Sequence, residues 1–212
     1  MSGYIIYHPK RTTTTHQSIT IYHDPIRNSN QDPYIWNRCF LHTYCHITQM
    51  SPKVGDYIFW VNGDTFPNFT HLYCDLVFVV EEKLYWLEAN NISPTDPIVD
   101  STEAYQEHYQ WAKYQHQLKK RKRFTLKAVS DASFQPQNGA GKLIDLIPLL
   151  KEVGWSVEEV QHGLKAGWQS KPMRLDSRAE SLYKRVSDVA LVKLYGADLQ
   201  SIKRQLALHV SL

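Results

Sequence analysis

Cysteine is scarce in this chain, and long apolar runs are missing. Three cysteines among 212 residues are too few, and too odd in number, for a disulfide framework, and they fit a reducing compartment. No apolar run approaches the roughly 18 residues that a membrane span needs. Residues 1–11 also lack the apolar stretch of a signal peptide. We therefore expect a cytoplasmic protein with no membrane partner.

Motifs of the common catalytic classes are also missing. The chain has no G-x-S-x-G elbow, and its ten histidines are scattered without a unique catalytic triad. The glycine-rich segment 137–142 lacks the G-x-x-x-x-G-K-[ST] spacing of a phosphate-binding loop, and Leu143 stands where Ser or Thr should be. The lack of these motifs favours a binding module over an enzyme.

Two Cys/His pairs have zinc-like spacing, namely Cys39-x-x-His42 and His71-x-x-Cys74. Both pairs fall in segments that read as extended structure. Residues three apart in a strand point to opposite faces of the sheet, which is a poor geometry for holding one ion. We therefore expect no metal and no other cofactor.

Charge is distributed unevenly along the chain. Residues 1–100 carry 6 Lys and Arg against 10 Asp and Glu, whereas residues 101–212 carry 18 against 11. A basic C-terminal half suggests an anionic partner. Hydrophobic residues make up 42% of the chain, which is enough for a core, and aromatic residues make up 12%. Aromatic side chains serve cores but also stack on planar ligands.

The N-terminal part of the chain reads mainly as β-structure. A turn at residues 53–56 precedes an apolar strand over 57–61. A second strand over 72–80 is interrupted only by Asp75, and a turn at 81–83 followed by 84–89 predicts a hairpin. Residues 102–118 have helical spacing, and residues 124–129 predict one more strand.

The C-terminal part reads as helical after a loop over 134–141. Residues 143–153 predict a helix, and a last helix is expected over about 197–210. Two capping boxes, Ser156 with Glu159 and Ser177 with Glu180, each predict the start of a helix. The second of these helices is expected to continue through Leu194 and to end near Gly196. We expect a mainly β domain with a basic aromatic helix over residues 1–137 and an α-helical region over residues 138–212.

The segment Ser51-Pro-Lys-Val-Gly-Asp-Tyr-Ile-Phe-Trp60 resembles the strand entry of PUA-like domains, including the ASCH and EVE groups and nucleotide-modification-associated members. The resemblance covers roughly residues 35–135. It implies an α+β fold with a PUA-like β-barrel, here followed by the helical region. It also implies recognition of nucleic acid, often of a modified base in an aromatic pocket, with Asp56 as the turn acid.

A basic run next to an aromatic helix strengthens the nucleic-acid reading. Lysine and arginine neutralise phosphates, and aromatic rings stack on bases. The predicted phosphate-contacting residues are Lys119, Lys120, Arg121, Lys122 and Arg123. The candidates for the base pocket are Trp36, Tyr57, Trp60, Asp75, His108 and Trp111. We therefore expect a module that binds DNA or RNA.

Two alternatives remain open from the residues. Asp75 and Glu88 lie on the predicted hairpin as the acids of a PD-(D/E)-x-K nuclease would, although Asn90 stands where that motif has lysine. The same two residues would serve a metal-dependent nuclease or a hydrolase of modified nucleotides. The helical C-terminal region could instead dock a protein partner.

Overall fold

A computed structural model of the chain describes residues 1–8, 11–23, 50–85, 124–166, 169–199, 201, 202 and 205. The strands are β1 (Gly3–Tyr7), β2 (Thr12–His16), β3 (Ile19–His23), β4 (Tyr57–Gly63), β5 (Leu72–Tyr85), β6 (Phe124–Ala128), β7 (Phe134–Gln137), β8 (Ile144–Asp145), β9 (Lys165–Ala166), β10 (Gln169–Ser170), β11 (Met173–Leu175) and β12 (Val192–Tyr195). The helices are α2 (Leu146–Glu152), α3 (Val157–Leu164) and α4 (Arg178–Val189).

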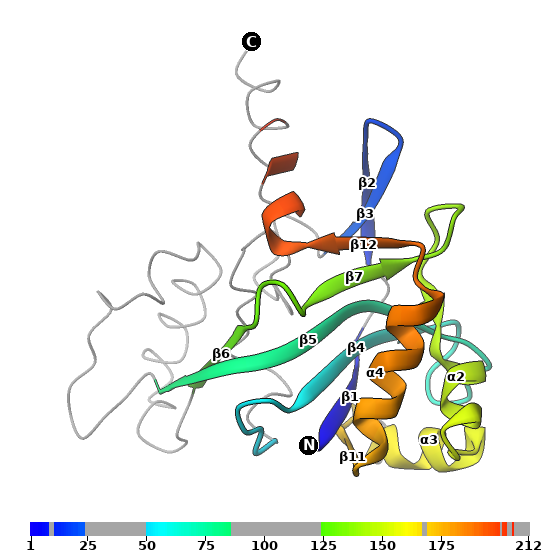
Figure 1. Cartoon of the computed structure of the whole chain (residues 1–212). Coiled ribbons are helices and arrows are strands. Elements are labelled where there is room, and N and C mark those ends of the chain that lie inside the picture. Colours follow the sequence, from blue (N-terminus) through cyan, green and yellow to red (C-terminus); the bar gives the residue numbers. More distant parts are fainter. Residues whose placement is uncertain are drawn as a thin grey trace, which may run out of the picture.

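One large sheet organises the molecule (Figure 1). Its strand order is β11-β1-β4-β5-β7-β12, and β6 and β8 also pair with β5. β1 and β4 run parallel, and the other pairs in the sheet are antiparallel. The α+β prediction is confirmed. The strands that the structure describes form an open path, so a closed barrel stays a prediction.

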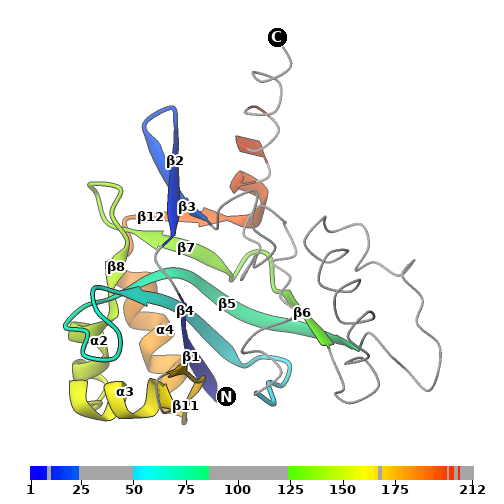
Figure 2. The same ribbon diagram turned by 180° about the vertical axis from the view of Figure 1, so that it is seen from behind.

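The alternation of side chains along the strands creates two apolar faces. Ile5, Phe59 and Val77 belong to one buried cluster together with residues of α2, α3 and α4, and we call this the helix face. Trp60 and Phe78 belong to a second cluster, which we call the hairpin face because β3 contributes to it. The helices lie in front of the sheet in Figure 1 and behind it in Figure 2, and in both views the β2–β3 hairpin projects beyond the sheet.

The domain boundary expected at residue 137 does not separate two structural units. β11 pairs with β1, β12 pairs with β7, and β8 pairs with β5, so strands from both sides of that residue share one sheet. The C-terminal part is therefore not purely helical. Strands of two to four residues are too short to show a period of two in the sequence.

The predicted hairpin turn at residues 81–83 is wrong. β5 continues through these residues to Tyr85 and pairs with β6. Glu81 is exposed and lies 3.2 Å from the ammonium group of Lys127 on β6, so its charge is accommodated at the strand surface. The loop expected over 134–141 is also partly strand, since β7 occupies its first four residues. Charge alone thus misidentified a solvated stretch of strand as a turn.

Two of the helices were expected to begin at a serine whose side chain caps the first turn. The capping box at α3 is confirmed: Ser156 Oγ accepts from the Glu159 amide at 3.1 Å, and Glu159 Oε2 accepts from the Ser156 amide at 2.7 Å. At α4, Ser177 makes no capping bond with its side chain, and Asp176 accepts from the Arg178 amide instead. The helix begins where predicted, but its cap differs. Its predicted continuation through Leu194 is wrong, because α4 ends at Val189 and β12 occupies residues 192–195, where it pairs with β7.

No helix in the described part of the chain has both the length and the apolar character needed to cross a membrane.

The Gly55–Asp56 turn ties the N-terminus to the start of β4. Gly55 has φ +85°, a conformation that glycine adopts at little cost. The buried carboxylate of Asp56 accepts from the Ser2 amide at 3.1 Å, from the Ser2 hydroxyl at 3.0 Å and from the Lys53 amide at 2.9 Å. The acid of this motif therefore fixes the turn and the first residues of the chain.

Replacing Asp56 by alanine is expected to lower the free energy of unfolding by about 1–3 kcal/mol, because two backbone amides lose their acceptor. Chemical denaturation measures this loss. Asp131→Ala is the control, since Asp131 is an exposed turn residue, and it should change stability by less than about 0.5 kcal/mol. Equal losses in the two variants would contradict a structural role for the Asp56 carboxylate.

Candidate functional site

A group of buried polar side chains interrupts the apolar hairpin face. Buried polar groups need partners, so a cluster of them in a core is informative. We call this group the Asp75 cluster; its members are His8, Arg11, His23, Asp75, Gln135 and Gln137, all of which are buried.

Asp75 owes its position to a β-bulge. Trp60 pairs with Leu76 and Val61 pairs with Cys74, so Asp75 is an extra residue on β5 with no partner on β4. Cys74 belongs to the helix face and Leu76 to the hairpin face. Asp75 lies on the hairpin side, because its carboxylate contacts His8, whose ring lies near that of Trp60. Bulges commonly redirect one side chain in this way next to functional sites.

The carboxylate of Asp75 forms a buried ion pair through one of its oxygens. Oδ2 accepts from Arg11 Nε at 2.6 Å and lies 2.9 Å from His8 Nε2. Burial by itself would raise the pKa of Asp75, but the charges of Arg11 and His8 and their hydrogen bonds outweigh burial, so the pKa lies below its ordinary value. Asp75 is therefore ionised at neutral pH although only 1% of it is exposed.

The other carboxylate oxygen of Asp75 is open. Within the described part of the chain, no group donates a hydrogen bond to Oδ1. A buried acceptor without a donor costs stability, and the cost is larger for a charged group. The cluster thus presents one ionised acceptor atom that a ligand with an N–H or O–H group would satisfy.

Gln135 links the β2–β3 hairpin to the bulge. Its Nε2 donates to the Tyr22 carbonyl at 2.8 Å and to the Asp75 carbonyl at 3.0 Å. Its Oε1 accepts from the Tyr22 amide at 2.9 Å and from Gln137 Nε2 at 3.1 Å. The side-chain amide of Gln135 therefore satisfies the backbone amide and carbonyl of Tyr22, as a neighbouring strand would. These hydrogen bonds hold the β2–β3 hairpin against the large sheet.

His23 ends β3 and lies against the same cluster. Its Nε2 lies 2.8 Å from the hydroxyl of Thr14, which lies two residues along β2 from Thr12, the residue that pairs with His23. Burial, followed by the positive charge of Arg11, lowers the pKa of His23 from 6.5 to about 4. His23 is therefore neutral at pH 7 and adds no positive charge beside Asp75.

The lowered pKa of His23 predicts a loss of stability in acid. Between pH 6.5 and 4 the unfolded chain binds a proton on this residue and the folded chain does not, so stability decreases as the pH falls through this window. The expected contribution is about 2 kcal/mol after allowance for solvent screening. His23→Gln cannot titrate, so the stability difference between wild type and this variant should shrink by that amount from pH 7 to 4.5. If the free energy of unfolding of wild type and of His23→Gln changed with pH in parallel, the prediction would be contradicted.

Of the residues predicted from the sequence for the base pocket, Trp60 and Asp75 lie on the same face. The Trp60 ring centroid lies 6.4 Å from that of His8, which contacts Asp75. Trp60 is 1% exposed and belongs to the core of the hairpin face. Tyr57 lies on the helix face, where its ring centroid is 4.8 Å from that of Tyr183. One pocket therefore cannot use both Tyr57 and Trp60.

The remaining sequence candidates lie outside the described residues. They are Trp36, Glu88, His108, Trp111, Lys119, Lys120, Arg121, Lys122 and Arg123.

Sequence reasoning missed the partners of Asp75. His8, Arg11 and Gln135 come from three distant segments and follow no shared motif. The one available signal was the charged residue within the apolar run of residues 72–80, because an acid in a buried strand requires a partner somewhere in the fold.

The donor set of the Asp75 cluster is poorly suited to a divalent ion. The Arg11 guanidinium already occupies the place beside Oδ2 that a cation would take. Among the residues that the structure describes, no group of three or more His, Cys, Asp or Glu side chains is arranged to hold a metal ion. The cluster therefore does not favour a metal-dependent nuclease.

Of the four possible zinc ligands, the two that the structure describes, His71 and Cys74, lie in different surroundings. His71 is about half exposed, and its Nδ1 lies 2.7 Å from Asp145 Oδ2. Cys74 is buried on the helix face, where burial first and the nearby Asp75 charge second raise the pKa of its thiol. Cys39 and His42 lie outside the described residues.

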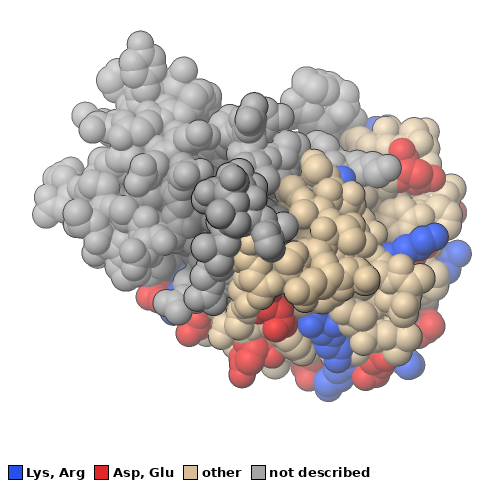
Figure 3. All heavy atoms as spheres, turned by 90° about the horizontal axis from the view of Figure 1, so that it is seen from above, with Lys and Arg blue, Asp and Glu red and all other residues tan. Residues whose placement is uncertain are grey.

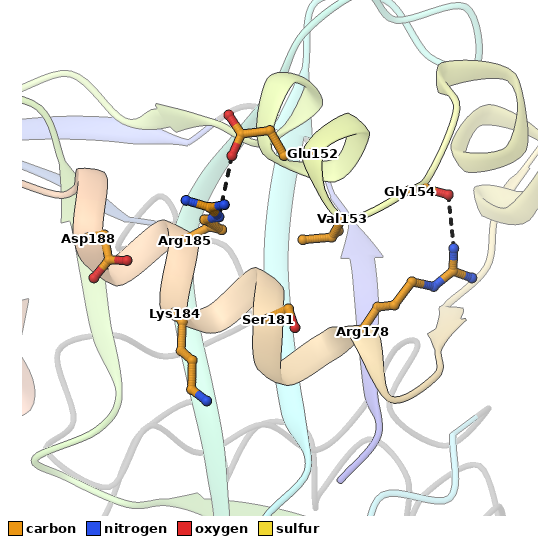
Figure 4. A pocket seen from close by; sticks show the side chains of 8 residues that line it. All are labelled: Glu152, Val153, Gly154, Arg178, Ser181, Lys184, Arg185 and Asp188. Carbon is orange, nitrogen blue, oxygen red and sulfur yellow. Dashed lines mark hydrogen bonds and ion pairs between the residues drawn. The ribbon is translucent and has the colours of Figure 1, made fainter.

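A surface groove of about 660 Å³ lies between α2 and α4 (Figure 4). Each of its cations forms an ion pair with a carboxylate: Arg178 lies 2.7 Å from Asp176, Lys184 lies 3.0 Å from Glu180, and Arg185 lies 3.4 Å from Glu152. On the face shown in Figure 3, acidic and basic side chains of the described residues are also interspersed. This groove therefore lacks the excess positive charge of a phosphate site.

No family model, no curated protein and no solved structure matches this chain. The candidate site accordingly rests on the geometry of the Asp75 cluster.

Proposed function

We propose that the chain is a nucleic-acid-binding module of the PUA-like type that holds one base, modified or unmodified, beside the Asp75 cluster. The observation that carries the proposal is the Asp75 carboxylate, which is ionised, buried and held by Arg11 and His8 through Oδ2, while Oδ1 has no donor among the described residues. Proteins read an unstacked base through hydrogen bonds to its edge. A fixed buried acceptor is suited to that task.

The exclusion of water from Asp75 strengthens any hydrogen bond made there. The cluster lies next to Trp60 and the apolar side chains of the hairpin face. A hydrogen bond to a charged group in such surroundings is stronger than one in water. Affinity for the backbone must come from elsewhere, and the run of five cations that begins at Lys119 is the strongest candidate in the sequence.

The Gly55–Asp56 turn supports the PUA-like part of the proposal. In this chain the turn introduces β4 and is fastened by the Asp56 carboxylate to Ser2 and Lys53. β4 then carries Trp60 onto the hairpin face, one strand away from Asp75 on β5. The motif that carries the resemblance therefore leads directly to the candidate site.

The proposal predicts a specific role for the basic run. Replacing Lys119, Lys120, Arg121, Lys122 and Arg123 with glutamine should weaken binding of a single-stranded oligonucleotide about tenfold or more at moderate salt. The slope of log affinity against log salt should also become flatter, since fewer counterions are released. Fluorescence anisotropy across a salt series measures both quantities.

A variant with the same change in net charge provides the control. It replaces five exposed cations on the helical part of the molecule with glutamine: Lys151, Lys165, Lys171, Lys184 and Arg185. This variant should keep most of the affinity and the slope. Equal weakening in both variants would mean that the basic run acts only through the net charge of the protein and contacts no phosphate. A wild-type chain that binds no oligonucleotide would overturn the proposed function.

A further inference from the structure

We propose that the outer edge of β2, the edge that faces away from β3, pairs with the same edge of a second copy of this chain. The two copies of β2 run antiparallel and join the two β2–β3 hairpins into one four-stranded sheet. This inference goes beyond the proposed function and does not depend on it.

The outer edge of β2 has no partner strand among the described residues. β2 and β3 form a two-stranded sheet of their own, with every residue of β2 paired to one of β3. The hairpin projects beyond the large sheet in Figures 1 and 2, so the strands of that sheet do not cover this edge. Thr13 and Thr15 are exposed. An edge of this kind offers a row of backbone donors and acceptors to another strand.

The contacts of Tyr22 show which residues of β2 point their backbone groups outward. The Tyr22 amide donates to Gln135 Oε1 at 2.9 Å, and the Tyr22 carbonyl accepts from Gln135 Nε2 at 2.8 Å, so both groups face away from β2. Tyr22 lies opposite Thr13, and in an antiparallel pair the backbone groups of opposed residues face either toward each other or away from each other. The amide and carbonyl groups of Thr13, and of Thr15 two residues further along, therefore point outward from β2.

The outward groups of Thr13 and Thr15 are complementary to themselves under a two-fold axis. When the axis passes through Thr14, Thr13 of each copy lies opposite Thr15 of the other copy. The two residues of such a pair exchange amide-to-carbonyl hydrogen bonds in both directions. Threonine side chains that lie opposite each other also stabilise an antiparallel strand pair. This register uses the whole of β2 and leaves its bonds to β3 unchanged.

The sequence of β2 does not protect its outer edge from pairing. Natural edge strands are commonly protected by lysine, by proline or by a bulge. β2 contains no proline, lysine, arginine or acidic residue, and its register with β3 has no shift. His16 lies opposite Thr12 in the proposed register, so the two histidines do not face each other. Two copies therefore meet without like-charge repulsion.

The occupant that best fits this edge is a copy of the same strand. β2 has threonine at four consecutive positions, so its sequence is nearly the same when read in either direction. An antiparallel copy therefore places threonine opposite threonine at the centre of the interface. An interface limited to one strand from each copy is smaller than that of a permanent dimer, so the dimer is expected to exchange with the monomer.

Sedimentation velocity of the full chain tests for the dimer. The average mass should rise from near one chain at about 1 µM toward two chains at about 300 µM, as expected for a small interface. A chain that stays monomeric at the highest concentration would overturn the inference. Oligonucleotide binding is measured separately, so either result leaves the proposed function to its own test.

Charge exchange at Thr13 and Thr15 tests the edge and its register. The double variant Thr13→Lys with Thr15→Lys places lysine opposite lysine in both pairs, and Thr13→Glu with Thr15→Glu places glutamate opposite glutamate. Each variant alone should dimerise about fivefold to thirtyfold more weakly than the wild type. An equal mixture of the two places lysine opposite glutamate and should recover at least the wild-type affinity. Wild-type affinity in either variant alone, or no recovery in the mixture, would overturn the inference.

A matched control and a measurement without substitutions complete the test. Ser130→Lys with Ser181→Lys adds the same charge at exposed positions outside β2 and should keep the wild-type affinity. Amide hydrogen exchange of the wild-type chain should become slower at Thr13 and Thr15 as the concentration rises. This result decides the inference even if the substituted chains do not fold. Unchanged exchange at both residues while the mass doubles would place the interface elsewhere and overturn the inference.

Discussion

Replacing Arg11 with methionine is expected to lower the free energy of unfolding by about 3–5 kcal/mol. The variant leaves Asp75 buried and charged, and His8 becomes its only partner among the described residues. Methionine retains much of the apolar part of the arginine side chain, so the decrease in the free energy of unfolding comes mainly from the lost ion pair. Urea denaturation at pH 7 measures it. The effect should decrease in strong acid, where Asp75 can be neutralised by a proton.

A double-mutant cycle isolates the interaction between Arg11 and Asp75. The double variant Arg11→Met with Asp75→Asn should be more stable than the sum of the two single losses implies, with a coupling of about 0.5–3 kcal/mol. Arg185→Met is the matched control, because Arg185 forms an exposed ion pair with Glu152 at 3.4 Å and should contribute at most about 1 kcal/mol. Equal losses for Arg11→Met and Arg185→Met would contradict the buried pair.

Replacing Trp60 with alanine is expected to cost about 3–5 kcal/mol of stability. The indole is 1% exposed and is packed in the same cluster as Ile58, Leu76 and Phe78, so its removal leaves a cavity in the hairpin face. A stacking residue in an open pocket would behave differently: its loss would reduce affinity and leave stability near that of the wild type. Chemical denaturation and oligonucleotide titration of the same variant distinguish the two roles.

A partly exposed tryptophan serves as the comparison for Trp60. Trp155 is only partly buried, and the Arg178 guanidinium lies 3.8 Å from the centroid of its ring. Trp155→Ala should therefore cost less than Trp60→Ala. A loss below about 1 kcal/mol for Trp60→Ala, accompanied by a large drop in affinity, would overturn its assignment to the core.

Local physical rules made several elements predictable. The strand over 57–61, the strand over 124–129 and the capping box of α3 depend on neighbouring residues. An apolar run after a turn, an alternating pattern and cap chemistry were therefore sufficient to find them. The same period of two places Tyr57 and Trp60 on opposite faces of β4, so their separation follows from strand periodicity alone. Asp75 was also visible as the one charge in an apolar strand.

The candidate site itself was decided by the tertiary structure. The bulge at Asp75 depends on how β5 registers against β4, and register is a property of the strand pair and not of either strand alone. The short strands β8, β11 and β12 form because the sheet offers them partners. His8, which follows β1, meets Asp75 because β1, β4 and β5 are neighbours, and Arg11, which precedes β2, reaches the same carboxylate. A buried carboxylate needs such partners because its desolvation is costly. The sequence by itself determined that Asp75 needs a partner, and only the fold decided which residues supply it.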